Sequence, residues 1–305
     1  MTKVFIDGSA GTTGLRIYER LADRKDLELL ILTGENRKNN DARRQMLALA
    51  DIAFLCLPDA AAIEAVSLIE NDHVAVIDTS TAHRTNDAWA YGFAELSAAH
   101  REAIAGSKRI ANPGCHASGF IAGCYPLVKS GLVPADFPLT AYSLTGYSGG
   151  GKALIAEYEA ADRDIRHESH RIYGTALMHK HLPEMQKICG LTQKPVFSPI
   201  LGDFYAGMAT SVLLPGFDAQ SVWECLNDHY AGQKLISVAP LGGDEPIIYA
   251  STLAGKDTMR IQVSGHSEQT MVTAVFDNLG KGASGAAIQN MNILLGVDEA
   301  TGLDV

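Results

Sequence analysis

A strand, a glycine-rich loop and a helix follow one another at the start of the chain, and this order constrains the fold more than any other feature. An apolar run, Val4 to Ile6, precedes the glycine loop (residues 8–14), and apolar residues recur at helical spacing from Leu15. Glycines in this context allow a tight turn and let the backbone approach a pyrophosphate at the helix N-terminus. The GxxGxxG spacing is a variant of the usual fingerprint. It predicts a dinucleotide-binding domain, with a generic strand–helix turn as the alternative.

The end of the second predicted strand bears on which dinucleotide binds. Residues 27–32 form that strand, and Glu35, Arg37 and Lys38 follow it. A basic side chain at this place can hold the 2′-phosphate of NADP, whereas an acidic one is typical of NAD sites. Arg37 therefore favours NADP, Glu35 leaves NAD open, and a solvated run of charges is the structural alternative.

Strand and helix patterns alternate through the first third of the chain. Further strands are predicted at residues 52–57, 74–77 and 108–111, with helical segments between them. Such repetition is typical of a Rossmann-type, doubly wound parallel sheet, in which ligands gather at the carboxyl ends of the strands. Ser80 and Arg84 follow the fourth strand and are candidates for holding the cofactor or a phosphate. A self-capped loop is the alternative.

The turn at residues 112–115 ends the fifth predicted strand and opens a new helical pattern. Asn112, Pro113 and Gly114 break the strand, and Cys115 then falls in the first turn of the helix. Free backbone N–H groups and the helix dipole favour negative charge there, which makes thiolates at such positions nucleophilic. We therefore predict that Cys115 is a catalytic nucleophile. The alternative is a small buried hydrophobic residue.

The pattern changes beyond residue 130. A helix is predicted at residues 219–230, and β-rich segments occur at residues 195–201, 207–214, 235–238, 247–251, 259–264 and 270–276. They predict an α+β domain with a mixed, largely antiparallel sheet. A chain of 305 residues accommodates two domains. We expect an NADP-binding domain over residues 1–115 and 283–305, and a domain for catalysis, substrate binding and oligomerisation over residues 116–282.

Two segments of the second domain carry further candidates. A glycine run follows the strand predicted at residues 139–145, so Gly149 and Gly150 can approach a ligand closely, and Lys152 comes next.

The second segment, residues 178–185, contains His179, His181 and Glu184. The two histidines, with Glu184 nearby, predict an acid–base pair that acts beside a thiolate. A metal site is less favoured because no third strong ligand is near, so we expect no metal. A pair of surface histidines is the bland alternative.

Composition excludes several classes of partner. The five cysteines are scattered and form no CxxC pair, so we expect neither a disulfide framework nor a zinc site. A net charge of −10 argues against a nucleic-acid surface. No apolar run reaches the roughly 18 residues that a membrane helix needs, and the chain begins without the pattern of a signal peptide. We expect a cytoplasmic protein without nucleic-acid or membrane partners.

Taken together, the motifs resemble the shorter form of the N-acetyl-gamma-glutamyl-phosphate reductases, which are relatives of aspartate-semialdehyde dehydrogenase. The resemblance covers nearly the whole chain and rests on the order of motifs at residues 6–17, 57–62, 78–84, 112–115, 146–152, 179–185 and 277–292. Two positions depart from the family pattern: Ala94 stands where proline is usual, and His116 where tyrosine is commoner. Because consecutive side chains on a helix point apart, we do not expect His116 to touch the thiolate.

The resemblance implies NADPH-dependent reduction of N-acetyl-gamma-glutamyl phosphate to the semialdehyde and phosphate, a step of arginine biosynthesis. Cys115 would form a thioester, one of His179 and His181 would supply a proton, with His179 preferred, and Glu184 would orient it or contact substrate. The residues implied to hold NADP are Gly8, Ser9, Gly11, Thr12, Thr13, Gly14, Arg37, Ser80, Gly149 and Gly150. Those implied to hold the small-molecule substrate are Arg84, Asn112 and Lys152. A homo-oligomer, dimer or tetramer, is also implied.

Two other functions fit the same motifs. The nearest is reduction of another acyl phosphate, such as aspartyl phosphate or a carrier-bound glutamyl phosphate, because the cysteine and glycine loops would look alike. A carrier protein would need a basic docking patch, which this acidic chain does not clearly show. From a different class, a non-catalytic NADP-binding sensor would need the glycine loop but not Cys115 or the histidine pair.

Overall fold

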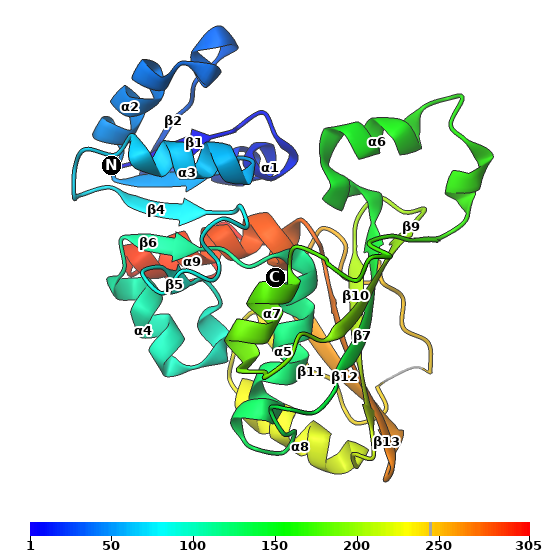
Figure 1. Ribbon diagram of the computed structural model, residues 1–305. Coiled ribbons are helices and arrows are strands. Elements are labelled where there is room, and N and C mark those ends of the chain that lie inside the picture. The colour runs from blue at the N-terminus through cyan, green and yellow to red at the C-terminus, as the bar shows by residue number, and fades with distance from the viewer. Residues whose placement is uncertain (244–245) are drawn as a thin grey trace. The chain divides into compact units, whose positions relative to one another are not determined.

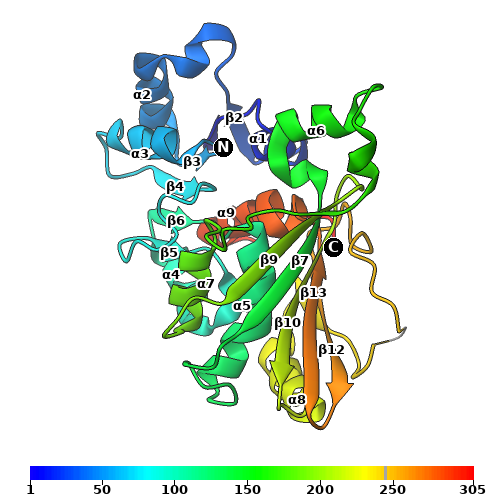
Figure 2. The same ribbon diagram turned by 45° about the vertical axis from the view of Figure 1, so that its right-hand side comes forward.

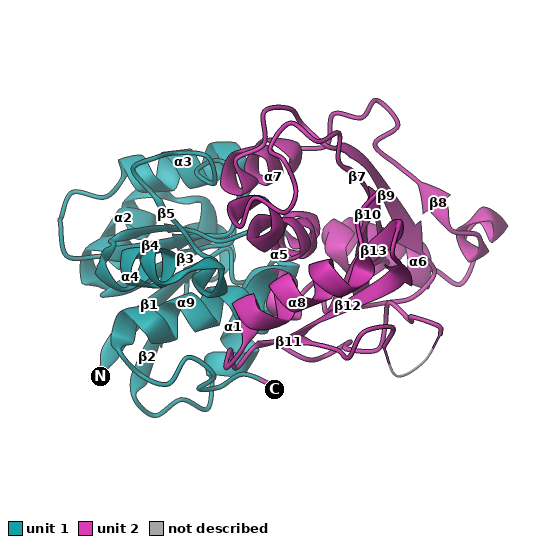
Figure 3. Cartoon of the chain, turned by 90° about the horizontal axis from the view of Figure 1, so that it is seen from below, with its two compact units in different colours: residues 1–114, 283–303 teal, residues 115–282, 304–305 magenta. Residues whose placement is uncertain are grey.

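A computed structural model describes residues 1–243 and 246–305. The chain divides into two compact units (Figure 3). Unit 1 contains residues 1–114 and 283–303, and unit 2 contains residues 115–282 and 304–305. Across the described ranges, no helix has the length and apolar character that crossing a membrane requires.

Unit 1 is built on a six-stranded sheet in which every neighbouring pair is parallel (Figure 1). The strand order is β2-β1-β3-β4-β6-β5, so the chain winds outward in both directions from β1 and β3. The strands are β1 (Thr2–Asp7), β2 (Leu27–Leu30), β3 (Ile52–Leu55), β4 (Ala75–Asp78), β5 (Ala90–Tyr91) and β6 (Arg109–Ala111). This topology confirms the predicted doubly wound sheet.

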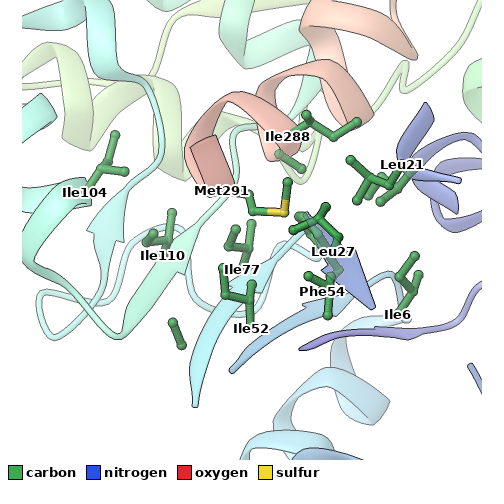
Figure 4. Packing of buried hydrophobic residues seen from close by; sticks show 14 of the residues in the cluster. Ile6, Leu21, Leu27, Ile52, Phe54, Ile77, Ile104, Ile110, Ile288 and Met291 are labelled. Atoms are coloured by element: carbon green, nitrogen blue, oxygen red, sulfur yellow. The ribbon is translucent and has the colours of Figure 1, made fainter. Parts of the chain in front are cut away.

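Helices cover both faces of this sheet because its central strands are buried along their whole length. On one face, α1, α4 and α9 bury Ile17, Ile104 and Met291 against strand residues such as Phe54 and Ile77 (Figure 4). On the other face, α2 and α3 cover the sheet through smaller clusters. The helices are α1 (Thr12–Leu21), α2 (Asn40–Leu49), α3 (Asp59–Ser67), α4 (Ala98–Gly106) and α9 (Gly285–Leu295).

Unit 2 contains a seven-stranded mixed sheet with the order β11-β12-β13-β10-β7-β9-β8. Two neighbouring pairs, β7–β9 and β11–β12, are parallel and the other four are antiparallel, which confirms the predicted mixed sheet. The strands are β7 (Thr140–Gly146), β8 (Arg171–Ile172), β9 (Val196–Gly202), β10 (Met208–Pro215), β11 (Ile236–Val238), β12 (Met259–His266) and β13 (Gln269–Phe276).

Three helices of unit 2, α5, α7 and α8, lie together on one face of this sheet (Figure 2). Two glycines let α5 approach the strands closely: a Cβ on Gly119 would lie 2.6 Å from the side chain of Thr210, and one on Gly123 would lie 3.2 Å from Val272. This close packing places the start of α5 directly over β10 and β13. The unit's helices are α5 (Cys115–Lys129), α6 (Gly151–Glu159), α7 (Leu182–Cys189) and α8 (Ala219–Tyr230).

One predicted strand, residues 247–251, was wrong. Residues 247–249 have no regular structure and turns follow them. The segment pairs with none of the described strands and instead lines a hollow with Arg260 and Gln262 of β12. Ile247 and Tyr249 are each 59% exposed. Their apolar and β-branched character therefore reflects a surface rather than a strand.

Candidate active site

Cys115 is the first residue of α5, directly after the turn that follows β6. Three hydrogen bonds within unit 1 hold that turn. The Asn112 amide donates to the carbonyl of Ala283 at 3.1 Å, the Asn290 amide donates to Asn112 Oδ1 at 3.1 Å, and Arg84 Nε donates to the Asn112 carbonyl at 2.9 Å. Asn112 and Arg84, both predicted to hold substrate, thus make buried structural bonds.

The loop at residues 78–84, which contains the predicted cofactor residue Ser80, is self-capped. The Asp78 carboxylate accepts from the Ser80 backbone N–H at 2.9 Å and from its hydroxyl at 2.7 Å. It also pairs with His83 Nδ1 at 2.6 Å, and His83 stacks on Trp89 with ring centroids 4.1 Å apart. These contacts fix the loop at the carboxyl end of β4. They are the bonds expected of a self-capped loop, which was the alternative to a ligand-binding role.

Cys115 opens into a pocket of about 660 Å³ that is formed by unit 2 alone. Segments distant in sequence contribute to this Cys115 pocket: the start of α5, the end of β7 with the glycine run, the β8 region, the histidine pair and β9. Its lining residues are Cys115, His116, Thr145, Gly146, Gly149, Gly150, Leu154, Arg171, Tyr173, His179, Lys180, His181 and Leu201. The predicted nucleophile, histidine pair and glycine run therefore come together.

Gly282 keeps the space beside the thiol open. A Cβ at this position would lie 3.0 Å from the Cβ of Cys115 and 3.0 Å from the carbonyl oxygen of Asp277. Any larger residue would clash with Cys115 or with the backbone carbonyl of Asp277, which cannot move easily. Sequence reasoning missed Gly282, and its place within the glycine-rich run at residues 280–285 was the available signal.

Three of the other four cysteines differ from Cys115 in their surroundings. Burial raises the pKa of Cys56 to about 12, and burial likewise raises the pKa of Cys124 and of Cys189. Thiols whose pKa is raised in this way remain protonated and inert. Cys115, by contrast, lines a pocket at a helix N-terminus, where free backbone N–H groups favour the thiolate.

The histidine pair lies immediately before α7. The backbone N–H of His181 donates to Nδ1 of His179 at 3.2 Å, and the two ring centroids are 4.7 Å apart. His181 is buried, and Glu184 is buried in the first turn of α7. Pro183 at the start of the helix suits this position because its missing N–H would have no partner within the helix.

His116 turns its ring toward this pair rather than into solvent. Its Nδ1 is 2.9 Å from Ser143 Oγ, and its Nε2 is 2.6 Å from Tyr173 OH. Burial lowers the pKa of His116 to about 3, with a smaller lowering from His179, so the ring is neutral at ordinary pH. Tyr173, which sequence reasoning missed, has its pKa raised by burial and secondarily by Cys115.

The basic and acidic side chains that line the Cys115 pocket are of one kind. Arg171 and Lys180 line it, and the lining set drawn from the described chain includes no aspartate or glutamate. Arg171 also pairs with Glu157 at 3.2 Å and lies over the Tyr158 ring, 5.3 Å from its centroid. The pocket therefore favours an anionic ligand.

The glycine loop of unit 1 has the geometry of a phosphate cradle. A Cβ on Gly8, whose φ is +86°, would lie 2.3 Å from the carbonyl oxygen of Cys56, and one on Gly14 would lie 2.4 Å from the carbonyl oxygen of Gly8. No side chain caps the N-terminus of α1. The Thr12 hydroxyl is buried without a hydrogen-bond partner among the described residues. Uncapped backbone N–H groups and a hydroxyl without a partner among the described residues are suited to donate hydrogen bonds to a pyrophosphate.

Of the remaining predicted residues, Arg37 and Lys152 are exposed, and Ser9 and Thr13 are half-buried. Arg37 lies in a short 3-10 helix and donates to the carbonyl of Gly34 at 3.2 Å. Lys152 is the second residue of α6, beside the glycine run but outside the lining of the Cys115 pocket. Ser9 and Thr13 belong to the glycine loop and the start of α1, respectively. Their roles stay predictions.

Comparison with known proteins follows the same division of the chain. Residues 3–106 match the family described as semialdehyde dehydrogenase, NAD binding domain, and residues 115–278 match semialdehyde dehydrogenase, dimerisation domain. The curated N-acetyl-gamma-glutamyl-phosphate reductases of Brucella ovis and Brucella canis are each 47% identical to this chain, over 96% of this chain and 99% of the relative.

Solved structures of lower identity share the fold. Aspartate semialdehyde dehydrogenase II from Vibrio cholerae, complexed with ASA, superposes with a TM-score of 0.76 at 18% identity, covering 97% of this chain and 98% of that one. Aspartate semialdehyde dehydrogenase with NADP from Candida albicans gives a TM-score of 0.68 at 16% identity, with coverage of 97% and 98%.

Proposed function

This chain belongs to the semialdehyde dehydrogenase family, among the N-acetyl-gamma-glutamyl-phosphate reductases, and we propose that it catalyses the reaction named in those relatives. That reaction is the NADPH-dependent reduction of N-acetyl-gamma-glutamyl phosphate to N-acetylglutamate semialdehyde and phosphate, a step of arginine biosynthesis. The observation that carries the proposal is the Cys115 pocket, where a helix-terminal thiol and two histidines line one cationic cavity. We assign the protein to the cytoplasm.

The residues of unit 1 fit a nicotinamide dinucleotide. The glycine loop, with the Thr12 hydroxyl, would hold the pyrophosphate. The buried Oδ1 of Asn290 has no partner among the described residues and suits the amide of a nicotinamide. Arg37, in the short 3-10 helix that follows β2, favours the 2′-phosphate, so we propose NADP rather than NAD.

The first chemical step uses the thiolate of Cys115. Its sulfur forms a bond to the acyl carbon, and the carbonyl electron pair moves onto oxygen. Backbone N–H groups in the first turn of α5 and N–H donors in the pocket stabilise that oxyanion. When the carbonyl re-forms, the bond from carbon to the phosphate oxygen breaks, and inorganic phosphate leaves with both electrons. A thioester on Cys115 remains.

The second step turns the thioester into the aldehyde. A bound nicotinamide supplies the hydride that reduces the thioester carbon. The chain's own residues stabilise the oxygen, on which the histidine pair can place a proton while the thiohemiacetal exists. As the carbonyl re-forms, that proton returns to the histidine pair, the bond from carbon to sulfur breaks and the sulfur leaves with its electrons as thiolate, the form that the start of α5 favours. Glu184, buried in the first turn of α7, is placed to orient this pair, and Arg84 and Asn112 hold the turn before Cys115.

The charge of the Cys115 pocket supports an N-acylated substrate over aspartyl phosphate. Arg171 and Lys180 attract the phosphate and the α-carboxylate. A free α-ammonium group would find no carboxylate among the lining residues described, whereas an acetylated nitrogen is uncharged.

We also propose a homo-oligomer, at least a dimer. Residues 115–278 match the dimerisation domain of the family. Exposed apolar side chains, Ile247 and Tyr249, border a second, smaller hollow on unit 2 that a partner would cover.

The proposed function is tested by oxidising two aldehydes in the reverse direction. With phosphate and NADP+, N-acetylglutamate semialdehyde should be consumed with a kcat/KM at least about 100-fold above that for aspartate semialdehyde. A parallel series with NAD+ measures cofactor preference. Faster oxidation of aspartate semialdehyde would support the aspartyl phosphate alternative. NADPH binding without turnover of either aldehyde would support the sensor.

A further inference from the structure

A buried ion pair lies directly before the glycine loop of unit 1. Asp7 is the last residue of β1, and Gly8 opens the loop. The carboxylate of Asp7 accepts a hydrogen bond from Nε of Arg43, in α2, at 2.9 Å. The side chains of Asp7 and Arg43 are 3% and 5% exposed, so water screens neither charge well. The charge of Asp7 therefore acts strongly on its surroundings unless Arg43 offsets it.

A carboxylate at this place has two opposite effects on an anionic ligand. It accepts a hydrogen bond from the backbone N–H of Gly8, which helps to hold the first residue of the loop. The same negative charge, however, lies one residue before a loop that is proposed to hold a pyrophosphate, and it would repel that ligand. A phosphate-binding loop that begins in this way therefore needs a compensating positive charge.

The surroundings of Asp7 show where that compensation comes from. Burial raises the pKa of Asp7, whereas the charge of Arg43, its hydrogen bond and the Gly8 N–H lower it. Arg43 is the charged side chain among these influences. If Arg43 were lost, the carboxylate of Asp7 would be buried without a cation, so it would either repel a phosphate or take up a proton.

Arg43 is held in place by three further acceptors. Its Nη1 donates to Asn40 Oδ1 at 3.2 Å and to Glu64 Oε2 at 3.1 Å, and its Nη2 donates to the carbonyl of Ala61 at 3.2 Å. The side chain of Glu64, on α3, is 50% exposed, so water screens its charge more than that of Asp7. These bonds fix the guanidinium in one orientation toward Asp7.

Two other titratable groups lie near Asp7. The backbone N–H of Cys56 donates to the carbonyl of Asp7 at 2.8 Å, and both Asp7 and Asp78 help to raise the pKa of the Cys56 thiol, after the larger effect of burial. Neither group can neutralise Asp7, because a protonated thiol is uncharged and a second carboxylate has the same sign. The compensation depends on Arg43.

We propose that Arg43 is a positioning residue for the cofactor: it cancels the charge of Asp7, so that Asp7 can hold Gly8 without repelling the pyrophosphate. The inference rests on the proposed function, in which unit 1 binds NADP. Arg43 acts through Asp7 rather than on the cofactor, because each of its three guanidinium nitrogens already donates to the protein. Loss of Arg43 and loss of the Asp7 charge should therefore have different effects on cofactor affinity.

The first test compares single and double variants by fluorescence titration with NADPH at pH 8. Arg43→Met leaves the charge of Asp7 uncompensated, so affinity should fall by about tenfold or more. Asp7→Asn removes that charge and keeps an acceptor for the Gly8 N–H, so affinity should equal that of wild type or rise by up to about fivefold. In the double variant Asp7→Asn/Arg43→Met, affinity should return to within about threefold of wild type.

Stability separates this role from a purely structural one. Both single variants break the buried pair, so both should lower the free energy of unfolding in urea. A purely structural pair predicts that NADPH affinity falls in both variants, in step with stability. A loss of affinity in Asp7→Asn as large as that in Arg43→Met would overturn the proposal, as would a double variant that binds no better than Arg43→Met.

The control removes a different ion pair of unit 1. Arg101, in α4, contacts Glu299 at 2.9 Å. Arg101→Met deletes one positive charge from the unit, as Arg43→Met does, but it should leave NADPH affinity unchanged. A tenfold loss in Arg101→Met as well would assign the effect to net charge and overturn the role of Arg43.

A pH series gives a second measurement. In Arg43→Met nothing from Arg43 lowers the pKa of Asp7, so Asp7 should take up a proton between pH 8 and pH 6. NADPH affinity relative to wild type at the same pH, which cancels the titration of the 2′-phosphate, should therefore recover at pH 6. A ratio that does not change with pH would overturn the proposal.

Arg43→Lys keeps the proposal testable if Arg43→Met does not fold. It retains a cation beside Asp7 but not the guanidinium geometry, so NADPH affinity at pH 8 should stay within about fivefold of wild type. A larger loss would show that geometry rather than charge matters. If wild type binds NADPH but does not reduce the acyl phosphate, the proposed reaction fails, while the titrations still decide the role of Arg43. If wild type binds no NADPH, the proposed cofactor and this inference both fail.

Discussion

The glycine loop of unit 1 and the Cys115 pocket of unit 2 solve the problem of holding an anion in different ways. The loop uses backbone: two glycines, Gly8 and Gly14, at which a Cβ would clash, an uncapped helix start and one buried hydroxyl within residues 8–14. The pocket uses side chains from segments that are far apart in sequence, held by hydrogen bonds such as that between His116 and Tyr173, 57 residues apart.

This difference shows which kind of site a local motif can encode. A backbone cradle needs only a short run of residues with suitable φ angles, so consecutive residues of the sequence can encode it. A side-chain pocket depends on which strands become neighbours, so its members are scattered. Substitutions in the loop should therefore alter cofactor affinity, and substitutions in the pocket should alter chemistry.

The largest expected effect concerns the pocket. Cys115→Ser should lower turnover by about 10⁴-fold or more, because a hydroxyl at this place is a far weaker nucleophile and leaving group. NADPH affinity, measured by fluorescence titration, should change less than threefold, roughly. Cys225→Ser, in α8 of the same unit, is the control and should remain fully active. Unchanged turnover in Cys115→Ser would remove the thiol from the mechanism.

The next effect concerns the loop. Gly8→Ala brings a Cβ to 2.3 Å from the Cys56 carbonyl oxygen at a φ of +86°, so NADPH affinity should fall by about tenfold or more, equivalent to 1.4 kcal/mol. Gly34→Ala is the matched control: its φ is also positive, at +58°, but no atom lies within 4 Å. A loss of the same size in both variants would trace the effect to strain rather than to the cradle.

A moderate effect is expected beside Cys115. Gly282→Ala places a Cβ 3.0 Å from that of Cys115, so the thiol must shift, and kcat should fall about tenfold. Gly106→Ala, in α4 of unit 1, serves as the control because no atom lies within 4 Å of its Cβ position and its φ is not positive. The NADPH dissociation constant should stay constant in both variants. A selective loss of NADPH affinity in Gly282→Ala would break the separation between loop and pocket.

The last effect is on stability rather than on activity, and it is a pH dependence. His116 has a folded pKa of about 3 against an ordinary value of 6.5, so the unfolded state binds more protons between these values. Its contribution is complete above pH 6.5 and declines as pH falls toward 3, by about 1.4 kcal/mol per pH unit. Urea unfolding at pH 7 and pH 5 should show a smaller drop in His116→Phe than in wild type. If the free energy of unfolding fell by the same amount in wild type and in His116→Phe, the pKa of His116 in the folded protein would be near its ordinary value.

The fold could be predicted because its signals are local. Apolar runs, glycine punctuation and helical spacing occur in consecutive residues and indicate the two sheets directly. The strand expected at residues 247–251 failed because a β-rich run forms a strand only where it pairs with a neighbouring strand, and this segment instead lines a surface hollow with Arg260 and Gln262.

The candidate site could be predicted only where chemistry and motif coincide. Cys115 was marked by its turn, and His179 and His181 by their spacing. Tyr173 and Arg171 carry no motif, and they join the pocket only because β8 pairs with β9. Asn112 and Arg84 show the converse: a polar residue beside a nucleophile can be engaged by the fold itself, through bonds to Ala283 and Asn112 that no sequence pattern reveals.

The central claim, that Cys115 carries the acyl group, is tested most directly by trapping the thioester. The protein is incubated with N-acetylglutamate semialdehyde and NADP+ in the absence of phosphate, so that the acyl group has no phosphate to accept it, then quenched in acid and digested. Mass spectrometry should find an N-acetylglutamyl adduct on the peptide that contains Cys115, removable by hydroxylamine and absent from Cys115→Ser. Turnover with no such adduct, or an adduct on another residue, would contradict the account.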